Sequence, residues 1–373
     1  MKLCIIQRIL PHYRIRFFQI LKKELQVLGI ELVLIYGQER ENTVPKTTEL
    51  TADWAHRVDN IYFDIFGSEL IWQPCLKYLK GVNLVIVEQS NRLLVNYWIL
   101  LKYRKNMVVS FWGHGRNLQG NKYSFKEKFK KYINRYVDYW FAYTEYSKQI
   151  LLQQNIDNNK ITVVNNTIDV SELSDNAKKY NADSLNIIKD EVGIASNNVA
   201  IFCGGFSENK NIKFLIDACY EIKELVQDFE VILIGSGPDQ KHVIDAAQNN
   251  KWIHYVGEKY GIDRVPYFLI SKAMLLPGAV GLAVIDSFSL GVPMITVDNE
   301  SHGPEASYLQ DEVNSLITSR DLTCYAKTVS NYFRDVDLQN KLKSGCVLMA
   351  RDITIENMVA RYVAGVKSAI NLV

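Results

Sequence analysis

Short apolar runs alternate with longer amphipathic stretches along almost the whole chain, and this alternation begins twice. Such runs are typical of strands buried in a parallel sheet, and the stretches between them are typical of helices that cover it. The first series of predicted strands is 3–7, 31–36, 84–87, 107–111, 139–143 and 161–164. The second series is 199–203, 231–235, 252–256, 273–276, 294–297 and 315–317. We therefore predict an α/β chain with two doubly wound, Rossmann-like domains.

The boundary between the two domains is predicted to lie in a polar segment. Residues 171–198 are rich in Asn, Asp, Ser and Lys and contain no convincing strand. A length of 373 residues also exceeds what one hydrophobic core usually serves. We predict domains at 1–190 and 191–350, and a C-terminal helix at 351–373 that packs back toward the first domain. The carboxyl ends of both sheets should face a cleft, where such sheets bind ligands.

Composition narrows the class of protein. A chain with 48% hydrophobic and 23% charged residues is typical of soluble globular proteins. The six cysteines lie far apart without a C-x-x-C pair, so neither a zinc knuckle nor a disulfide framework is indicated. The start lacks the pattern of a signal peptide, and no apolar run approaches the roughly 20 residues that span a bilayer. We therefore expect a cytoplasmic protein.

Glycines and a lysine mark the first strand end of the second domain. Gly204 and Gly205 follow the strand, and Lys210 directly precedes an expected helix at 212–225. Glycines here let backbone amides approach a phosphate, and a lysine near a helix N-terminus opposes the dipole and favours a bound anion. A solvated surface lysine is the alternative. Gly235 and Gly237 follow the next strand, where a tight turn and nucleotide contact are equally good interpretations.

The segment 276–293 is the most informative. Its strand ends in Pro-Gly, and a helix expected from Gly281 should direct the amides of Gly281 and Leu282 into the cleft. Asp286 lies in an apolar helix, where a carboxylate must find hydrogen-bond donors or have a raised pKa. Ribose hydroxyls would suit it; a capping or surface aspartate is the alternative. Beyond the next strand, His302 and Glu305 are possible donor-sugar contacts, although Glu305 also fits a first helical turn after Pro304.

Taken in order, these pieces resemble glycosyltransferase family 4, whose members are retaining enzymes with the GT-B fold. Residues 276–293 resemble the family's proline–serine, E-x7-E and glycine-x-proline block, and 231–238 resemble its strand with G-x-G-P. Residues 143–148 and 166–169 resemble its serine–glutamate and N-G-V-D elements. The chain departs from the pattern at three places: the first glutamate falls on Gly278, the ribose-binding glutamate on Asp286, and the phosphate-binding arginine on Gly205.

The resemblance implies a function. It is transfer of a hexosyl or related group, with retention, from a UDP- or GDP-sugar to a glycan or polyprenyl-linked acceptor, in synthesis of capsule, O-antigen, lipopolysaccharide or exopolysaccharide. Domain 191–350 would bind the nucleotide sugar and domain 1–190 the acceptor. Lys210 and the glycine amides would neutralise the leaving diphosphate. Two alternatives stay open: a catalytically degenerate GT-B protein that binds glycan or nucleotide, and a GT-B nucleotide-sugar epimerase.

No cofactor or metal is expected besides the nucleotide sugar. The single D-x-D sequence, at 335–337, lies between C-terminal helices and is interpreted as a helix cap. In the first domain, flanking glycines expose His114 after a strand, and the family carries a histidine here that approaches the transferred sugar. Arg116 is a candidate for binding a phosphate or an acidic acceptor sugar. The loop after the first strand offers His12, Tyr13 and Arg14 as possible acceptor contacts.

A basic, aromatic stretch at 122–140 has two interpretations. Its lysines include Lys126, Lys128, Lys130 and Lys131. They fit either a core-facing helix with a solvated basic face or an interfacial helix that holds the enzyme on anionic lipid, at the inner face of the cell membrane. No nucleic-acid-binding motif accompanies these residues, so we expect no nucleic acid partner.

Overall fold

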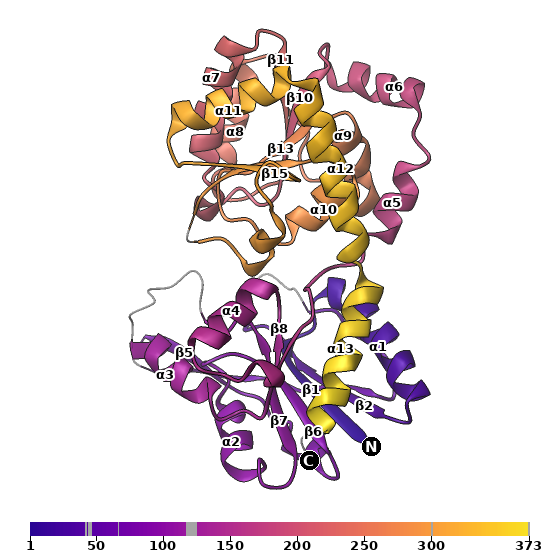
Figure 1. Cartoon of the computed structure of the whole chain (residues 1–373). Coiled ribbons are helices and arrows are strands. Elements are labelled where there is room, and N and C mark those ends of the chain that lie inside the picture. The colour runs from indigo at the N-terminus through magenta and orange to yellow at the C-terminus, as the bar shows by residue number, and fades with distance from the viewer. Residues whose placement is uncertain (42, 44–46, 66, 117–124, 300, 372–373) are drawn as a thin grey trace. The chain divides into compact units, whose positions relative to one another are not determined.

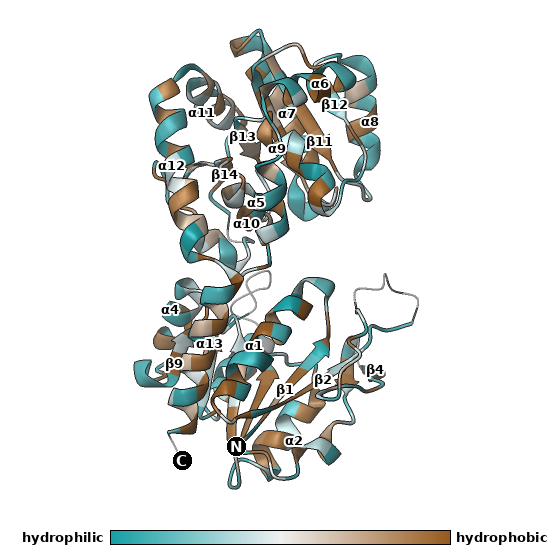
Figure 2. Ribbon diagram, turned by 90° about the vertical axis from the view of Figure 1, so that its right-hand side faces the viewer, coloured by the Kyte–Doolittle hydropathy of each residue, from teal (hydrophilic) through white to brown (hydrophobic). Residues whose placement is uncertain are grey.

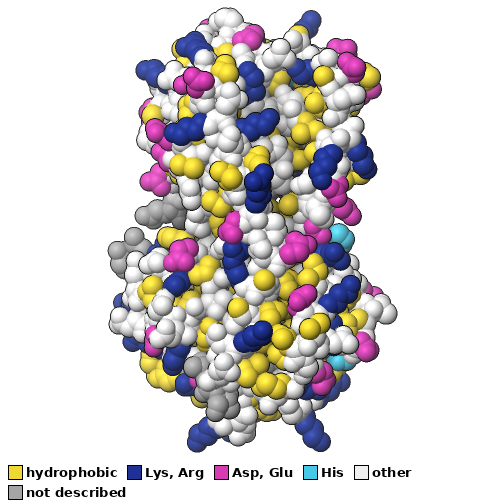
Figure 3. Space-filling view, turned by 45° about the vertical axis from the view of Figure 1, so that its right-hand side comes forward, with side chains coloured by type: hydrophobic (Ala, Val, Ile, Leu, Met, Phe, Trp, Pro, Cys, Tyr) yellow, Lys and Arg dark blue, Asp and Glu magenta, His cyan; other side chains and the backbone are white. Residues whose placement is uncertain are grey.

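The chain forms two compact α/β units in a computed structural model (Figure 1). Unit 1 comprises Met1–Asp169 and Ile355–Val373, and unit 2 comprises Val170–Thr354. The structure describes residues 1–371 apart from 42, 44–46, 66, 117–124 and 300. On the face in Figure 3, acidic and basic side chains are interspersed, in keeping with a formal net charge of +2.

Unit 1 contains a parallel sheet with the strand order β3-β2-β1-β6-β7-β8-β9. Its strands are β1 (Lys2–Ile9), β2 (Glu31–Gly37), β3 (Ala55–Arg57), β6 (Leu84–Glu88), β7 (Val108–Gly113), β8 (Tyr139–Ala142) and β9 (Ile161–Val163). Leu3 pairs with Leu32 on one side and with Leu84 on the other. Successive residues of each strand enter two different apolar clusters, one on each face. Both faces are therefore buried, as a doubly wound sheet requires.

Helices cover both faces of this sheet (Figure 2). The helices of unit 1 are α1 (Ile15–Val27), α2 (Leu94–Lys102), α3 (Phe125–Asn134), α4 (Glu145–Gln153) and α13 (Ile355–Ile370), with 3-10 turns η1 (His12–Arg14), η2 (Leu76–Leu79) and η3 (Asn158–Lys160). One cluster joins α1 and α13, where Tyr362 stacks on Phe141 at 4.5 Å between ring centroids. The opposite cluster contains residues of α2 and α4. A separate antiparallel hairpin consists of β4 (Ile61–Ile65) and β5 (Ser68–Trp72).

Unit 2 contains a parallel sheet with the strand order β12-β11-β10-β13-β14-β15, which is the order of a Rossmann sheet. Its strands are β10 (Asn198–Cys203), β11 (Phe229–Ile234), β12 (Ile253–Tyr255), β13 (Ala273–Leu275), β14 (Met294–Val297) and β15 (Ser315–Thr318). Its helices are α5 (Ser171–Ala177), α6 (Ala182–Val192), α7 (Ile212–Leu225), α8 (Gln240–Asn249), α9 (Val265–Leu269), α10 (Ala283–Ser289), α11 (Leu322–Arg334) and α12 (Val336–Asp352), with 3-10 turns η4 (Glu208–Lys210), η5 (Gly261–Arg264) and η6 (Pro304–Tyr308).

The predicted fold class is confirmed, with corrections in detail. Every predicted strand is present, but the predicted boundary at 190 is wrong. Unit 2 begins at Val170, because α5 contacts α9 and α10, and α6 contacts α9. The final helical segment of unit 1 begins at Ile355 rather than at 351, because α12 extends to Asp352 and packs on α10. None of the helices in the described residues has the combined length and hydropathy of a membrane-spanning segment.

Candidate functional site

The candidate donor site lies at the carboxyl edge of the unit 2 sheet. Strands β10 and β13 are neighbours, although they are not consecutive, so the strand order reverses between them. Open α/β sheets bind ligands at the carboxyl ends of the strands at such a switch point. The loop after β10 carries Gly204, Gly205 and Lys210, and the loop after β13 carries Gly278, Gly281 and Leu282. The fold therefore brings these two predicted groups to one place.

Gly235 and Gly237 allow adjacent loops to touch. A Cβ at Gly235 would overlap with the carbonyl oxygen of Gly204, and one at Gly237 would overlap with that of Phe206. The loops are also joined by backbone hydrogen bonds, including Phe206 N–H to the Ser236 oxygen at 2.7 Å. The G-x-G at 235–237 is therefore needed for loop packing, which favours the turn interpretation of these two glycines.

Gly278 packs on the backbone of Lys210. A Cβ at position 278 would overlap with Lys210 main-chain atoms, and the Ala279 amide donates to the Asn209 oxygen at 2.8 Å. This close contact explains why a glutamate is absent here: any side chain at 278 would displace the loop that carries Lys210.

Lys210 itself is partly buried. Its Nζ donates to the carbonyl oxygen of Ala279, and burial lowers the pKa of its ammonium group. No carboxylate forms an ion pair with Lys210 in the part of the chain that the structure describes. An ammonium group has three donors, so two stay available for an anion. The position therefore suits a phosphate.

His302 holds the loop after β13 in place through hydrogen bonds of its ring. Its Nδ1 accepts from the Val280 amide at 3.0 Å, and its Nε2 donates to the Val297 oxygen at 2.9 Å. Burial lowers the pKa of His302, in agreement with this neutral form. Both ring nitrogens are engaged within unit 2, so the predicted donor-sugar contact through the His302 ring has no free nitrogen to use. Glu305, also a predicted sugar contact, is buried in η6 directly after Pro304.

Asp286 forms an ion pair that the sequence analysis did not include. The carboxylate is 5% exposed, and Arg264 from η5 binds both of its oxygens, at 2.9 and 2.8 Å. Burial raises the pKa of Asp286 to about 6, although Arg264 opposes this rise. The hydrogen-bond donor predicted for this carboxylate is thus an arginine within unit 2, and a ribose would share it. Arg264 Nε is buried without a partner among the described atoms.

Two other predicted features of unit 2 concern the surroundings of Gly205 and the start of helix α10. Gly205 is exposed, and a Cβ there would meet only the Ser236 oxygen, at 4.0 Å. The predicted helix start at Gly281 is wrong: α10 begins at Ala283, because Gly281 and Leu282 form turns that accept from Val284 and Ile285. Asp335 caps α12 by accepting from the Leu338 amide at 2.9 Å, which confirms the cap interpretation.

In unit 1, His114 follows β7 in a half-buried position. Its ring lies against Tyr143 with centroids 4.3 Å apart, and Nδ1 has no partner among the described residues. Burial, followed by the charges of Lys130 and Arg14, lowers the pKa of His114 to about 4. His114 is therefore neutral at pH 7 and offers hydrogen bonds rather than charge.

Three amide side chains hold the peptide groups of Gly115, next to His114. Gln89 Oε1 accepts from the Gly115 amide at 2.8 Å, and Asn134 Nδ2 donates to the Gly115 oxygen at 2.8 Å. Gln154 Nε2 donates to the same oxygen at 3.2 Å, and Asn134 also bonds both Gln89 and Gln154 at 2.8 Å. We call Gln89, Asn134 and Gln154 the amide clamp. Sequence reasoning missed it, because its members are separate in sequence and form no motif.

The residues of unit 1 predicted to bind the acceptor or the membrane differ in how deeply they are buried. Arg14 is buried, while His12 and Tyr13 are exposed. Arg116 donates to the Tyr146 hydroxyl at 2.9 Å. Among the predicted docking lysines, Lys128 and Lys131 are exposed, and the side chain of Lys126 lies outside the described residues, as do residues 122–124. Lys130 is a correction: it is partly buried, and its charge reaches His114.

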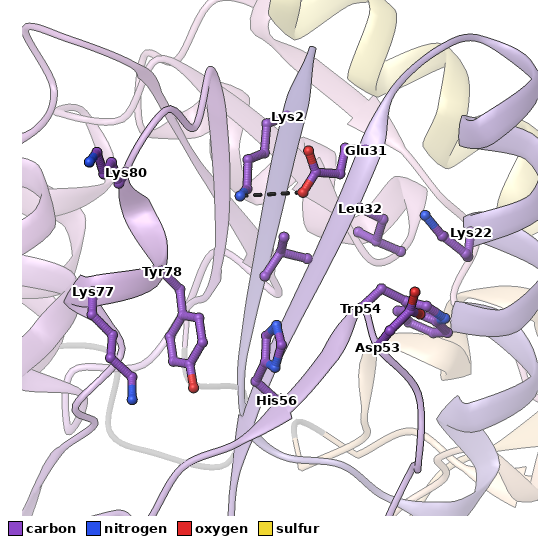
Figure 4. Close-up of a pocket in the computed structure, with 11 residues that line it drawn as sticks. Lys2, Lys22, Glu31, Leu32, Asp53, Trp54, His56, Lys77, Tyr78 and Lys80 are labelled. Carbon is purple, nitrogen blue, oxygen red and sulfur yellow. Dashed lines mark ion pairs between the residues drawn. The ribbon is translucent and has the colours of Figure 1, made fainter.

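A second basic region lies at the opposite, amino edge of the unit 1 sheet (Figure 4). It is an open pocket of about 390 Å³, where His56 stacks on Tyr78 with ring centroids 4.7 Å apart. Two of its charges cancel, because Lys2 pairs with Glu31 at 3.3 Å. As ligands of parallel α/β sheets bind at the carboxyl edge, this pocket is separate from the candidate site. None of the described residues form a group of His, Cys, Asp and Glu able to hold a metal.

Comparison with known proteins agrees with this geometry. A family model described as glycosyl transferases group 1 matches residues 197–335, which is most of unit 2. HepE from Anabaena, solved with UDP, has a TM-score of 0.69 and 12% identity, covering 99% of this chain and 100% of that one. A glycosyltransferase from Rickettsia africae has a TM-score of 0.70 and 15% identity, with 99% and 98% covered.

A putative UDP-N-acetylglucosamine 2-epimerase from Listeria monocytogenes is also similar, with a TM-score of 0.62, 15% identity, and 98% and 96% covered. No curated protein sequence matches the chain. The chain therefore has the two-unit fold of the GT-B glycosyltransferases, and its second unit is similar to glycosyl transferases group 1.

Proposed function

We propose that the protein is a glycosyltransferase that takes a sugar from a nucleoside diphosphate and transfers it, with retention, to a glycan or lipid-linked acceptor. One observation carries the proposal: Lys210, a partly buried cation without a carboxylate partner in the described residues, lies at the switch point of the unit 2 sheet. The match of residues 197–335 to glycosyl transferases group 1 supports it, as does the UDP bound to the similar HepE.

The mechanism follows from the groups available. As the bond to the sugar breaks, negative charge develops on the diphosphate, and the Lys210 ammonium stabilises it without reorganisation. Buried Asp286 and the partly exposed side chain of Arg264 provide an ion pair for the nucleoside. His114, neutral at pH 7, donates or accepts a hydrogen bond at the transferred sugar. We propose front-face attack by the acceptor hydroxyl, whose proton passes to the departing phosphate; no metal takes part in the proposal.

A nucleotide-sugar epimerase is the second candidate, favoured by the similarity to the Listeria protein. The two differ in what they need. An epimerase converts its nucleotide sugar without any acceptor, whereas a transferase releases the nucleoside diphosphate and extends an acceptor. Product analysis with and without added glycan therefore separates them, and the catalytically inactive binding protein yields neither product.

The first test is binding. A thermal-shift screen with UDP, GDP and ADP and their hexose derivatives should show one preferred base, and calorimetry should give its affinity. We expect UDP or GDP to bind, and the Lys210→Ala variant to bind either more weakly. If no nucleoside diphosphate stabilises the protein, the proposal is wrong.

We also propose that the enzyme works at the cytoplasmic face of the membrane, in synthesis of capsule, O-antigen, lipopolysaccharide or exopolysaccharide. The surface of α2 and α3 supports this location. Trp98, Phe129 and Tyr132 are exposed there, beside Lys128 and Lys131. The rings of Tyr97 and Phe129, 5.7 Å apart, join the two helices. Aromatic rings beside lysines are suited to the headgroup region of an anionic bilayer.

A further inference from the structure

Basic side chains gather at the carboxyl edge of the unit 1 sheet without a carboxylate paired to them. Arg14, in η1 of the loop after β1, is 4% exposed. Its guanidinium donates to Asn166 Oδ1 and lies 5.0 Å from the centroid of the Trp112 ring. No ion pair includes Arg14 in the described ranges of the chain. A buried cation without a counter-charge is costly, so this arrangement needs an explanation.

Lys130 reaches the same place from α3. Burial lowers the pKa of its ammonium group, and Glu127, one turn earlier, opposes that effect. The positive charges of Lys130 and Arg14 both act on His114, so both cations lie in the neighbourhood of this neutral ring. His114 Nδ1 has no hydrogen-bond partner among the described atoms. Two cations and an unused polar atom therefore converge.

Glu127, one turn before Lys130, acts on its charge, but the two form no ion pair among the described residues. Residues 117–124, which follow Arg116, contain no Asp or Glu. Nearby acidic residues already have partners: Asp169 pairs with Arg16 at 3.7 Å, and Glu145 accepts from Gln149 at 2.9 Å. The charge of Arg14 and Lys130 is thus left for a ligand.

We propose that the carboxyl edge of unit 1 binds an anionic group of the acceptor, a phosphate or a sugar carboxylate, through Arg14 and Lys130. This inference rests on the proposed function, because it names the chemical class of the acceptor. The donor diphosphate has its own cation, Lys210 in unit 2, so the cations of unit 1 are a second anion site. The acceptor is then a phospholipid-linked glycan or a glycan that ends in an acidic sugar.

Inorganic phosphate and glucuronate are the probes, and glucose is the neutral control. Each is titrated into the full chain by calorimetry, with and without saturating UDP, which occupies the donor site. Imidazole NMR follows His114 in parallel. We expect phosphate and glucuronate to bind in the presence of UDP, glucose to bind at least about tenfold more weakly, and the pKa of His114 to rise when the anion is bound.

Two variants assign the binding. Lys130→Gln should weaken phosphate binding about tenfold, as expected for loss of one charge-assisted hydrogen bond. Lys23→Gln, on an exposed part of α1, should leave it unchanged. Circular dichroism checks that both variants fold. At buried Arg14 the conservative variant Arg14→Lys is used, because it keeps the charge and disturbs the core less than a neutral side chain would.

Each outcome decides the proposal. If UDP abolishes phosphate binding, the anion belongs to the donor site and the proposal is overturned. Equal binding by Lys130→Gln, or an unmoved His114 resonance, also overturns it, because phosphate then binds elsewhere. If UDP fails to bind while phosphate binding still depends on Lys130, the donor proposal fails and the anion site stands.

Discussion

Arg264 and Asp286 form a two-point ion pair in the candidate donor site. Breaking a buried pair leaves one charge without a partner, whereas removing both residues does not. We expect Arg264→Met to lower the free energy of unfolding by roughly 3 kcal/mol, the low end for such pairs, because buried Asp286 can bind a proton once Arg264 no longer opposes the rise of its pKa. The double variant Arg264→Met/Asp286→Leu should recover most of this loss. Urea unfolding of both variants and of the single variant Asp286→Leu completes the cycle, and simple additivity would contradict the pairing.

The same pair gives a pH dependence. The pKa of Asp286 is raised to about 6 from a usual 3.8, because burial disfavours its charged form. Its contribution to stability is therefore full below about pH 4 and is lost as pH rises through about 6. In Asp286→Asn, the unfolding free energy should lose this part of its pH dependence. The same variant should bind UDP or GDP more weakly if Asp286 contacts the ribose, and equal affinity by calorimetry would show that it does not.

Position 205 shows how an unusual residue can be tested by restoring the usual one. Gly205 is exposed with open space around its Cα, so an arginine fits there without moving the backbone. We expect Gly205→Arg to bind UDP up to about tenfold more tightly, since it adds a charge-assisted hydrogen bond beside Lys210. Gly205→Met, of similar length but uncharged, is the control. If calorimetry gives both variants equal affinity, position 205 does not face the phosphates.

At the scale of elements, the amide clamp links Asn134 of α3 and Gln154, which follows α4, to the loop of His114. Asn134→Ala removes the bonds to Gly115, Gln89 and Gln154 and leaves buried polar groups unpaired. We expect a loss of about 1–3 kcal/mol in stability and a larger fall in kcat, because a misplaced group can cost about 100-fold. UDP affinity should not change. Gln149→Ala, an exposed amide on α4, is the control, and an unchanged kcat for Asn134→Ala would argue against positioning.

Elements also show what the sequence could and could not predict. The strands were predictable, because apolar runs such as 199–203 and 294–297 are buried on both faces of the sheet and are separated from one another by more polar segments. The hairpin of β4 and β5 was not predicted. Its residues Ile61, Phe63 and Ile65 alternate with polar residues, as in a strand, but their side chains are exposed rather than packed in a core. The Arg264–Asp286 pair and the amide clamp were missed for another reason: each joins residues of different elements, and single-chain periodicity carries no information about such contacts.

The surface of α2 and α3 predicts membrane binding that salt should weaken. Replacing Lys128 and Lys131 by Gln removes two exposed charges, worth about 1 kcal/mol each near an anionic surface. We expect binding to vesicles with anionic lipid to fall, while hydrolysis of a soluble donor is kept. Lys130 is left intact, because it belongs to the His114 region. Lys241→Gln/Lys251→Gln in unit 2 has the same net charge, and equal co-sedimentation of both double variants at low salt would rule out this surface.

At the scale of the whole molecule, the proposed function divides its tasks between the two units. Lys210 and its glycine-rich loops belong to unit 2, and His114 with its clamp belongs to unit 1. A GT-B transferase needs both, yet nucleotide binding should need only unit 2. We therefore expect Lys210→Ala to weaken UDP binding and to cost about 2–4 kcal/mol of transition-state stabilisation, as for loss of an oxyanion-hole donor.

His114→Ala should show the opposite division: UDP affinity equal to that of the parent, and a transfer rate reduced through kcat. Calorimetry with UDP and steady-state kinetics on the same preparations separate the two effects, and thermal unfolding checks that both variants are folded. If His114→Ala weakens UDP as much as Lys210→Ala does, the nucleotide is bound by both units, and the assignment of donor binding to unit 2 alone must be abandoned. If Lys210→Ala leaves both affinity and rate intact, the leaving phosphate is neutralised elsewhere, and Arg264, with its unpartnered Nε, becomes the next cation to replace.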